Sequence, residues 1–477
     1  MSSLDLFISR QSEPRGHVHF IGIGGTGMGP LAELTKAHGL QVSGSDSKYS
    51  TYLEKLKKMG LDVHLGHDNE AIITNADVIV LSSAIQPHNI ELNYAIKSKK
   101  LIIHRSDLLK SFLHKKLNSI TVSGTNGKTT TTAMIAYLLH TLGKDPEAVV
   151  GASMNNFERS VLTGVGDTIV IESDESDGTF LKYQPTIGVI TNIRNDHLDF
   201  YKNQDALVQA FENHVHQIHD NGTLITSSDD PWSCKLISKK TTFKKKIDFL
   251  SFGTQNQSDI QLTEYHNKEG YSSFTLKNNG TYHKGKMPLI GAHNIYNAMA
   301  ALCAVKASHL DIKQAIESLE SFKGVSRRLD LVYNVNHFKI YDDYAHNPSK
   351  IYSCTSAVKE SWENHQLIVI FQPHRYSRLK TLYNEFINAF TQCHHVIVLP
   401  VYGVDEQVDH LYAPAKIAND IFLSSKVDVT AVQNFEEACT QVFKLSKLSR
   451  TIALTVGAGD IWKLAHLLKE KVETSRL

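Results

Sequence analysis

The sequence predicts an α/β protein built from three successive blocks of strands and helices. Its 477 residues allow two to four domains with a core in each. Short apolar segments alternate with helical patterns in three cycles, and such β-α-β order is typical of a parallel sheet with helices on both faces. Two of the three cycles begin with a strand that leads directly into a glycine-rich turn.

The first block begins with a predicted strand at residues 18–23 and a helix at 31–38. Further strands are expected at 41–43 and 78–81. The stretch 110–118 is polar, which predicts a linker to the next block.

The second block repeats the order, with predicted elements at residues 120–122 (strand), 129–142 (helix), 168–171 and 187–191 (strands). Residues 248–288 differ, because short alternating segments and polar turns predict a small antiparallel excursion there. A helix at 295–307 closes this block. The third block starts near Gly324, and its strands are expected at 339–341, 367–371, 396–399 and 452–456.

Composition excludes several classes of protein. The 50 basic and 49 acidic side chains give a formal net charge of +1, so the broad basic field of a nucleic-acid binder is absent. The five cysteines form no CxxC pair, which argues against a disulfide framework and for a reducing compartment. The sequence has no apolar signal core and no run of about 18 apolar residues. We expect a cytoplasmic protein with neither nucleic acid nor a membrane as partner.

The first glycine-rich turn spans residues 22–27 and matches GxGxxG between a strand and a helix. Without Cβ atoms the backbone can approach a pyrophosphate, and the helix N-terminus supplies N–H donors. Asp46 follows the last glycine by 19 residues, where such folds contact a ribose or base. The turn indicates nucleotide binding. Alone it would suggest an NAD-dependent dehydrogenase, and a tight turn without a ligand is the structural alternative.

The second glycine-rich turn, GTNGKT at residues 124–129, predicts an ATP site. Backbone N–H groups of such a turn wrap phosphate oxygens, Lys128 reaches the terminal phosphates and the Thr129 hydroxyl can bind Mg²⁺. The turn is shorter than the usual GxxxxGK[ST] pattern, because Val122 stands where that pattern has its first glycine.

Acidic residues follow the next predicted strand, in the segment ESDESD at 172–177. The carboxyl end of a buried strand is where nucleoside triphosphatases place metal ligands. Glu172 is the first residue after the apolar run, whereas Asp174 and Asp177 also fit a solvated acidic turn. His197 follows the strand at 187–191, and a structural histidine and a ligand for a second cation are equally compatible with that position.

Taken together, these segments resemble the Mur amino-acid ligase family over nearly the whole chain. The resemblance rests on eleven ordered segments: HFIGIGGTGMGPLAE, SGSD, SSAI, SGTNGKTTTT, ESDESDGTFL, TNIRNDHLDFY, GAHNIYNAMAA, GVSRRLD, YDDYAHNPSKI, FQPHRYSRLKTL and TVGAGDIWKLA. The combination of HFIGIGG, ESDESD, FQPHRYSR and GAGDI is similar to the alanine-adding branch of the family.

The resemblance implies a fold and a reaction. The fold comprises an N-terminal Rossmann-like domain (residues 1–115), a central P-loop-like ATPase domain (116–322) and a C-terminal Rossmann-like α/β domain (323–477). In the reaction, the lactyl carboxylate of UDP-N-acetylmuramate takes the γ-phosphate of ATP, and L-alanine attacks the resulting acyl phosphate. ADP, phosphate and a peptidoglycan precursor are formed. ATP is the implied co-substrate, with Mg²⁺ or Mn²⁺.

Residue roles carry over from the family by position. The UDP-sugar is expected to contact Gly22, Gly24, Gly25, Thr26, Gly27, Ser45, Asp46 and Ser83. ATP is expected to contact Gly124, Thr125, Asn126, Gly127, Lys128, Thr129, Thr130, His293, Asn294, Asn297, Arg328 and Asp343. The amino acid is expected to contact Tyr344, His346, His374, Arg375 and Arg378. The implied metal ligands are Thr129, Glu172 and His197, and the implied catalytic residues are Lys128, Glu172, His197 and Arg375.

Two positions depart from the alanine-adding pattern, because Asn126 and Asn347 replace histidines that are usual there. Asn126 is found in sister ligases, and the two changes bear on which amino acid is accepted. Residues 207–213 contain no lysine of the kind that some sister ligases carbamylate, which agrees with the alanine-adding branch.

Three other functions are alternatives to an alanine-adding ligase. A recycling ligase would attach a preformed peptide to UDP-N-acetylmuramate in a roomier pocket. An NAD-dependent oxidoreductase would leave the second turn, Glu172 and the third block without roles. A non-catalytic UDP-sugar-binding protein would not need a complete ATP turn.

Overall fold

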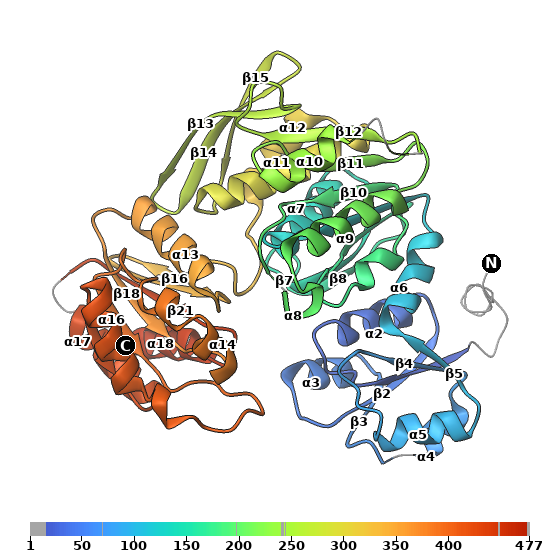
Figure 1. The fold of residues 1–477 in the computed structure, drawn as a ribbon, viewed down its shortest axis with the longest axis horizontal. Coiled ribbons are helices and arrows are strands. Elements are labelled where there is room, and N and C mark those ends of the chain that lie inside the picture. Colours follow the sequence, from blue (N-terminus) through green and yellow to red (C-terminus); the bar gives the residue numbers. More distant parts are fainter. Residues whose placement is uncertain are drawn as a thin grey trace. The chain divides into compact units, whose positions relative to one another are not determined.

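The computed structural model describes residues 16–68, 70–196, 198–239, 243, 245–446 and 449–474. Three sheets of five, ten and six strands follow one another along the chain and form three α/β domains (Figure 1). In the part of the chain so described, no helix is long and apolar enough to cross a membrane. By its internal contacts the chain divides into two compact units. One holds the third sheet with Glu264–Thr275 and Lys284–Ile295, and the other holds the first sheet and most of the second.

The first sheet is parallel throughout and has the order β3-β2-β1-β4-β5, as in a Rossmann-like fold. Its strands are β1 (His17–Ile21), β2 (Gln41–Asp46), β3 (Asp62–Leu65), β4 (Val78–Leu81) and β5 (Leu101–His104). Its helices are α2 (Met28–Ala37), α3 (Thr51–Lys58), α4 (Glu70–Asn75), α5 (Ile90–Lys97) and α6 (Arg105–His114). The central strand β1 is buried along its whole length, and its carboxyl end leads into the first glycine-rich turn.

The predicted linker at residues 110–118 is wrong. Helix α6 extends to His114, and β6 (Asn118–Ser123) begins four residues later. Leu108, Leu109, Phe112 and Leu113 are buried, and this spacing places them on one face of a helix. Lys110 between them and Lys115 and Lys116 after them hide that pattern when the segment is judged by polarity alone.

The second sheet has ten strands in the order β15-β14-β13-β12-β11-β10-β6-β9-β7-β8. Besides β6, these are β7 (Glu147–Met154), β8 (Arg159–Thr163), β9 (Thr168–Glu172), β10 (Ile187–Ile190), β11 (Thr223–Ser227), β12 (Asp248–Gly253), β13 (Ile260–Lys268), β14 (Tyr271–Asn278) and β15 (Thr281–Met287). The helices are α7 (Lys128–Thr141), α8 (Leu198–Tyr201), α9 (Gln204–Gln217), α10 (Pro231–Ser238), α11 (Ala292–Ala307) and α12 (Ile312–Ser318). Strands β9, β6, β10 and β11 are parallel neighbours, so their carboxyl ends share one edge.

The antiparallel excursion predicted for residues 248–288 is confirmed only in its later part. Two-residue turns with positive φ, Glu269-Gly270 and Asn279-Gly280, join β13 to β14 and β14 to β15, as in tight hairpins. Strand β12, by contrast, pairs in parallel with both β11 and β13. It therefore extends the parallel sheet.

The third sheet has the order β16-β17-β21-β18-β19-β20, with only β16 antiparallel to its neighbour among these strands. Its strands are β16 (Asp330–Val335), β17 (Phe338–Asp343), β18 (Gln366–Phe371), β19 (His395–Val398), β20 (Asp428–Ala431) and β21 (Thr451–Val456). The helices are α13 (Pro348–Ser361), α14 (Tyr376–Thr381), α15 (Tyr383–Ile387), α16 (Pro414–Ser425), α17 (Phe435–Ser446) and α18 (Trp462–Thr474). Leu367 and Val369 pack into one core and Ile368 and Ile370 into another, so β18 is buried on both faces, as parallel strands are.

Candidate functional site

The first glycine-rich turn is held by the end of β2. The N–H groups of Gly22 and Ile23 donate to the Ser45 carbonyl at 2.8 and 2.9 Å, and that of Gly24 donates to Asp46 Oδ2 at 2.9 Å. A Cβ on Gly24 would lie 2.9 Å from the same oxygen. This close approach explains why glycine stands there, and it gives the Asp46 carboxylate a role in shaping the turn.

The later part of the turn is open to a ligand. Gly25, Thr26 and Gly27 are exposed, and no hydrogen bond within the described chain uses the N–H groups of Thr26 and Gly27. Helix α2 begins at Met28, so these free donors stand at its positive end. The arrangement suits a diphosphate.

The other predicted UDP-sugar residues lie close by, in different surroundings. Ser45 is wholly buried and donates its hydroxyl to Glu91 Oε2, so its carbonyl and not its side chain contacts the turn. Ser83 is exposed and donates to Asp177 Oδ2 at 3.2 Å. Arg105, which the sequence analysis missed, donates to the same Asp177 oxygen at 3.4 Å. A Cβ on Gly27 would lie 3.4 Å from its guanidinium, so Arg105 brings a positive charge to the turn. The sequence signal that could have identified Arg105 is its position directly after β5.

The second glycine-rich turn joins β6 to α7. Gly124 and Gly127 have φ of 120° and 88°, values that disfavour any residue with a Cβ. There is no space for one either, because it would lie 2.3 Å from Thr191 Oγ1 at Gly124 and 2.2 Å from Asn297 Oδ1 at Gly127. Conformation and space both require glycine at these two positions.

Asn192, at the carboxyl end of β10, holds the middle of this turn and was not predicted to do so. Its carbonyl accepts from Thr125 N at 3.0 Å and its Oδ1 from Asn126 N at 3.1 Å, while its Nδ2 donates to the Asn126 carbonyl at 2.9 Å. The turn is therefore preformed. Asn126 Oδ1 is buried and has no hydrogen-bond partner among the described residues.

Lys128 forms a largely buried ion pair, in which its own side chain is 13% exposed. Its Nζ donates to Glu175 Oε1 and Oε2 at 3.0 and 2.9 Å and to the Gly124 carbonyl at 2.8 Å, and Asp174 lies 3.6 Å away. Burial opposes the charge, but the carboxylates of Glu175 and Asp174 outweigh it and raise the pKa of Lys128. The lysine is thus a fixed cation at the turn. Glu175 is 1% exposed and was not assigned a role from the sequence.

Thr129 and Glu172, the two predicted metal ligands that the structure describes, lie side by side. Thr129 Oγ1 donates to Glu172 Oε1 at 3.0 Å, and Gly151 N donates to Oε2 at 2.8 Å. One hydroxyl and one carboxylate next to a glycine-rich turn form an oxygen set that suits Mg²⁺, an ion that usually takes its remaining ligands from phosphate and water. His197 lies outside the described residues.

Helix α11 carries the residues predicted at the adenine. Asn297 is buried and its Oδ1 accepts from Thr131 Oγ1 at 3.3 Å, so it lies against the start of α7. Asn294 is also buried and donates from Nδ2 to the Ile290 carbonyl at 2.9 Å. His293 is exposed. Thr130 is buried in the first turn of α7.

In the third domain, Asp343 ends β17, and burial raises the pKa of its carboxyl although the nearby charge of Arg328 acts to lower it. Asp343 is buried, and its two oxygens accept from Leu329 N at 2.8 Å and Ala345 N at 2.7 Å. Its carboxylate therefore fixes two backbone segments. The guanidinium groups of Arg327 and Arg328 lie 4.8 and 5.3 Å from the centre of the Tyr344 ring, within the range of a cation–π contact.

The predicted amino-acid residues gather across the ends of β17 and β18. The His346 ring lies 5.2 Å from that of Tyr344 and 6.4 Å from that of His374. Arg378 Nη1 donates to His374 Nδ1 at 3.1 Å, because arginine has no acceptor. Burial, aided by nearby cations, lowers the pKa of His346 to about 3 and that of His374 to about 4. Both rings are therefore neutral at neutral pH.

Arg375 differs from its neighbours. Its side chain is exposed, and within the described chain its guanidinium makes no hydrogen bond or ion pair. Its backbone has φ 68° and ψ 130°, which is unusual for a residue with a Cβ and is found mostly at functional sites. An exposed guanidinium of this kind can pair with a carboxylate in two hydrogen bonds.

Asn347 stands outside this cluster of side chains. Its Oδ1 accepts from Lys350 N at 3.0 Å and from Ser349 Oγ at 3.2 Å, and Pro348 occupies the first position of α13. Asparagine is among the best residues for such a cap. The departure at this position is thus explained by the helix that follows it.

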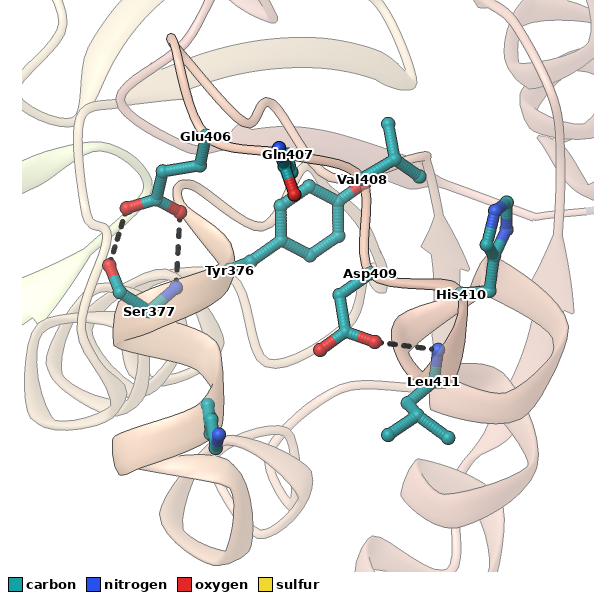
Figure 2. A pocket seen from close by; sticks show the side chains of 9 residues that line it. Tyr376, Ser377, Glu406, Gln407, Val408, Asp409, His410 and Leu411 are labelled. Carbon is teal, nitrogen blue, oxygen red and sulfur yellow. Dashed lines mark hydrogen bonds between the residues drawn. The ribbon is translucent and has the colours of Figure 1, made fainter.

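A cavity of about 750 Å³ opens beside the same cluster. It is lined by Tyr376, Ser377 and Lys380 of α14 and by residues 406–411 (Figure 2). Glu406 accepts from Ser377 N at 3.1 Å and from Ser377 Oγ at 2.5 Å, which ties the loop after β19 to the start of α14.

Known proteins match the chain along almost its whole length. Residues 17–116 match the model described as the Mur ligase family, catalytic domain. Residues 122–305 match the Mur ligase middle domain, and residues 327–459 match the Mur ligase, glutamate ligase domain.

Individual relatives agree with these matches. UDP-N-acetylmuramate–L-alanine ligases of Endomicrobium trichonymphae and Desulfosudis oleivorans are 35% and 36% identical, each over 94% of this chain and 97% of its own length. The solved structure of UDP-N-acetylmuramate-alanine ligase from Thermotoga maritima is 28% identical with a TM-score of 0.81, over 96% of this chain and 99% of that one.

Proposed function

The chain belongs to the Mur ligase family of ATP-dependent, amide-bond-forming enzymes, and we propose that it joins L-alanine to the lactyl carboxylate of UDP-N-acetylmuramate. The observation that carries the choice of substrates is the near-full-length relation to alanine-adding ligases. We place the reaction in the cytoplasm, where ATP is available. The proposed domain boundaries remain 1–115, 116–322 and 323–477.

The first half of the reaction needs a rigid phosphate site. A carboxylate oxygen of the muramate attacks the γ-phosphorus of ATP, and the bond from this phosphorus to the β-γ bridging oxygen breaks. ADP departs, and the muramate carries an acyl phosphate. Such transfers depend mainly on positioning and charge neutralisation. The turn held by Asn192 supplies backbone donors, and Lys128 supplies a cation for the terminal phosphates. The preformed turn supports this part of the proposal.

A divalent cation fits next to the turn. Mg²⁺ or Mn²⁺ held by Thr129 and Glu172 would neutralise phosphate charge when bound, and His197 is proposed as a ligand of a second cation. Adenine is proposed to lie at His293, Asn294 and Asn297. Arg328 and Asp343 are proposed to reach the nucleotide from the third domain.

The second half of the reaction needs the amino acid held by its carboxylate. The amine attacks the acyl carbon, a tetrahedral intermediate forms, and phosphate leaves as the amide is made and the amine loses a proton. We propose that Arg375 and Arg378 bind the α-carboxylate and that Tyr344, His346 and His374 line the site. The guanidinium of Arg375, which is exposed and has no partner among the described residues, supports this assignment.

The test is phosphate release from ATP with UDP-N-acetylmuramate and a panel of amines. The panel contains L-alanine, glycine, L-serine and a murein peptide, and product mass identifies what was added. L-Alanine is expected to give the highest kcat/KM. A clear preference for the peptide would move the chain to the recycling ligases, and release that does not depend on UDP-N-acetylmuramate would refute the proposal.

A further inference from the structure

Tyr402, which follows β19, lies against the loop that carries the proposed carboxylate-binding arginines. The backbone forms a parallel bridge between His374 and Tyr402. Tyr402 N donates to the Pro373 carbonyl at 2.8 Å, and the Tyr402 carbonyl accepts from Arg375 N at 2.9 Å. One residue therefore fixes both sides of His374.

The side chain of Tyr402 also contacts His374, through a stack of the two rings. Its ring and the His374 ring are nearly parallel, at 9°, with centroids 5.7 Å apart, which is the geometry of an offset stack. The base of the same side chain is close to Gly459, where a Cβ would lie 2.6 Å from Tyr402 Cγ. Gly459 belongs to the loop after β21, so the Tyr402 side chain contacts the loops that follow two neighbouring strands, β18 and β21.

These contacts of Tyr402 explain two features of the proposed amino-acid site. Arg375 keeps an unusual backbone conformation, with φ 68°, which persists only where the surroundings impose it, and the Tyr402 carbonyl is one such restraint. His374 must present Nδ1 to Arg378, and a stacked ring prevents the imidazole from turning away.

We propose that Tyr402 is a positioning residue for the amino substrate, acting through His374 and Arg375 on the orientation of the two arginines. The inference rests on the proposed function of this cluster and extends it to a residue in a different loop. The positioning role depends on the aromatic ring and the backbone of Tyr402. The hydroxyl makes no hydrogen bond within the described chain, and the side chain is 39% exposed.

The test compares Tyr402→Ala with Tyr402→Phe, which keeps the ring. Tyr352→Ala is the matched control, because Tyr352 is 46% exposed in the same domain and contacts none of the proposed site residues in any described interaction. In Tyr402→Ala we expect the KM for L-alanine to rise at least about tenfold. Alaninamide lacks the carboxylate that the two arginines are proposed to bind, so the preference for L-alanine over alaninamide should fall by a similar factor. The KM values for ATP and UDP-N-acetylmuramate should stay within about twofold. Tyr402→Phe and Tyr352→Ala should behave like wild type.

An alanine KM within about twofold of wild type in Tyr402→Ala, or an equal rise in all three KM values, would overturn the inference. A second readout does not depend on turnover. The pKa of His374, followed by NMR in the full chain, should rise by about one unit or more in Tyr402→Ala and stay unchanged in Tyr402→Phe. If wild type made no product with L-alanine, the proposed function would fail, and the titration of His374 alone would decide for or against the role of Tyr402.

Discussion

Replacing Glu175 with glutamine removes the negative charge of the Lys128–Glu175 ion pair while keeping the shape of the side chain. The pair is largely buried, with Glu175 1% and Lys128 13% exposed, and Lys128 Nζ lies within 3.0 Å of both carboxylate oxygens. In the variant the lysine keeps the Gly124 carbonyl at 2.8 Å and Asp174 at 3.6 Å. It loses the Glu175 carboxylate, which balances its charge in a site with little access to water.

The expected loss of stability follows from that burial. Removing one member of a buried ion pair typically costs about 3–5 kcal/mol, because the other charge is left uncompensated. Asp174 stays close but is 45% exposed, so it recovers little of this energy. We expect Glu175→Gln to lower the free energy of unfolding by about 3 kcal/mol. Bound ATP should reduce the deficit, since its phosphates supply the missing negative charge to Lys128 and stabilise the folded state by mass action.

The assay is urea unfolding of the full chain at pH 7, with and without a saturating non-hydrolysable ATP analogue and Mg²⁺. Glu212→Gln is the matched control. Glu212 pairs with Lys239 at 2.6 Å on the surface of the same domain, where a pair contributes at most about 1 kcal/mol. The control should show a small deficit that the nucleotide does not change. A Glu175→Gln deficit of the same size with and without nucleotide would show that Lys128 does not meet the phosphates.

Three further outcomes are expected. Glu172→Gln should lower turnover strongly, with partial recovery at high Mg²⁺ or Mn²⁺, since it weakens the cation beside Thr129; an unchanged metal titration would make Glu172 structural. Asp46→Ala frees Gly24 N, so it should raise the KM for UDP-N-acetylmuramate and leave that for ATP nearly unchanged, and a selective ATP defect would contradict the assignment. Asp342 is buried beside Arg327, and burial raises the pKa of its carboxyl to about 6 from 3.8. Because the folded-state pKa is the higher one, the stability that Asp342 contributes is complete below about pH 4 and is lost as pH rises through 6. The loss amounts to up to about 3 kcal/mol, so Asp342→Asn should grow more stable relative to wild type over that range in urea unfolding. A constant difference across pH would refute this.

The sequence predicts best the parts of the fold where local pattern and tertiary burial agree. Strands such as β4, β9 and β18 are continuous apolar runs because both of their faces are covered, and they were located within a residue or two. The first two loops that follow such runs were identified because glycine there is required by backbone geometry.

Short and half-exposed elements were missed. Strands β3, β5 and β20 contribute few buried side chains, so neither their length nor their apolar content separates them from loops. Edge strand β16 pairs only with β17 among the described strands, and its alternating pattern is broken by a bulge between Leu331 and Tyr333.

Partners distant in sequence could not be derived from the chain alone. Asn192 holds a turn 66 residues earlier, and Tyr402 stacks on a histidine from a different loop. A rule that follows every strand to its carboxyl end would have placed both residues at the right edge. It would not have told which of the neighbouring polar side chains makes the contact, because that depends on loop conformations.

The central claim is that the muramate carboxylate is activated as an acyl phosphate before the amine attacks, and oxygen transfer tests it most directly. The substrate is UDP-N-acetylmuramate with ¹⁸O in both oxygens of its lactyl carboxylate, and the released phosphate is analysed by mass spectrometry after reaction with ATP and L-alanine. Each turnover should leave one ¹⁸O in the amide and carry one ¹⁸O into phosphate, because the carboxylate oxygen that attacked phosphorus leaves with it. Unlabelled phosphate accompanying the labelled amide product would contradict the account.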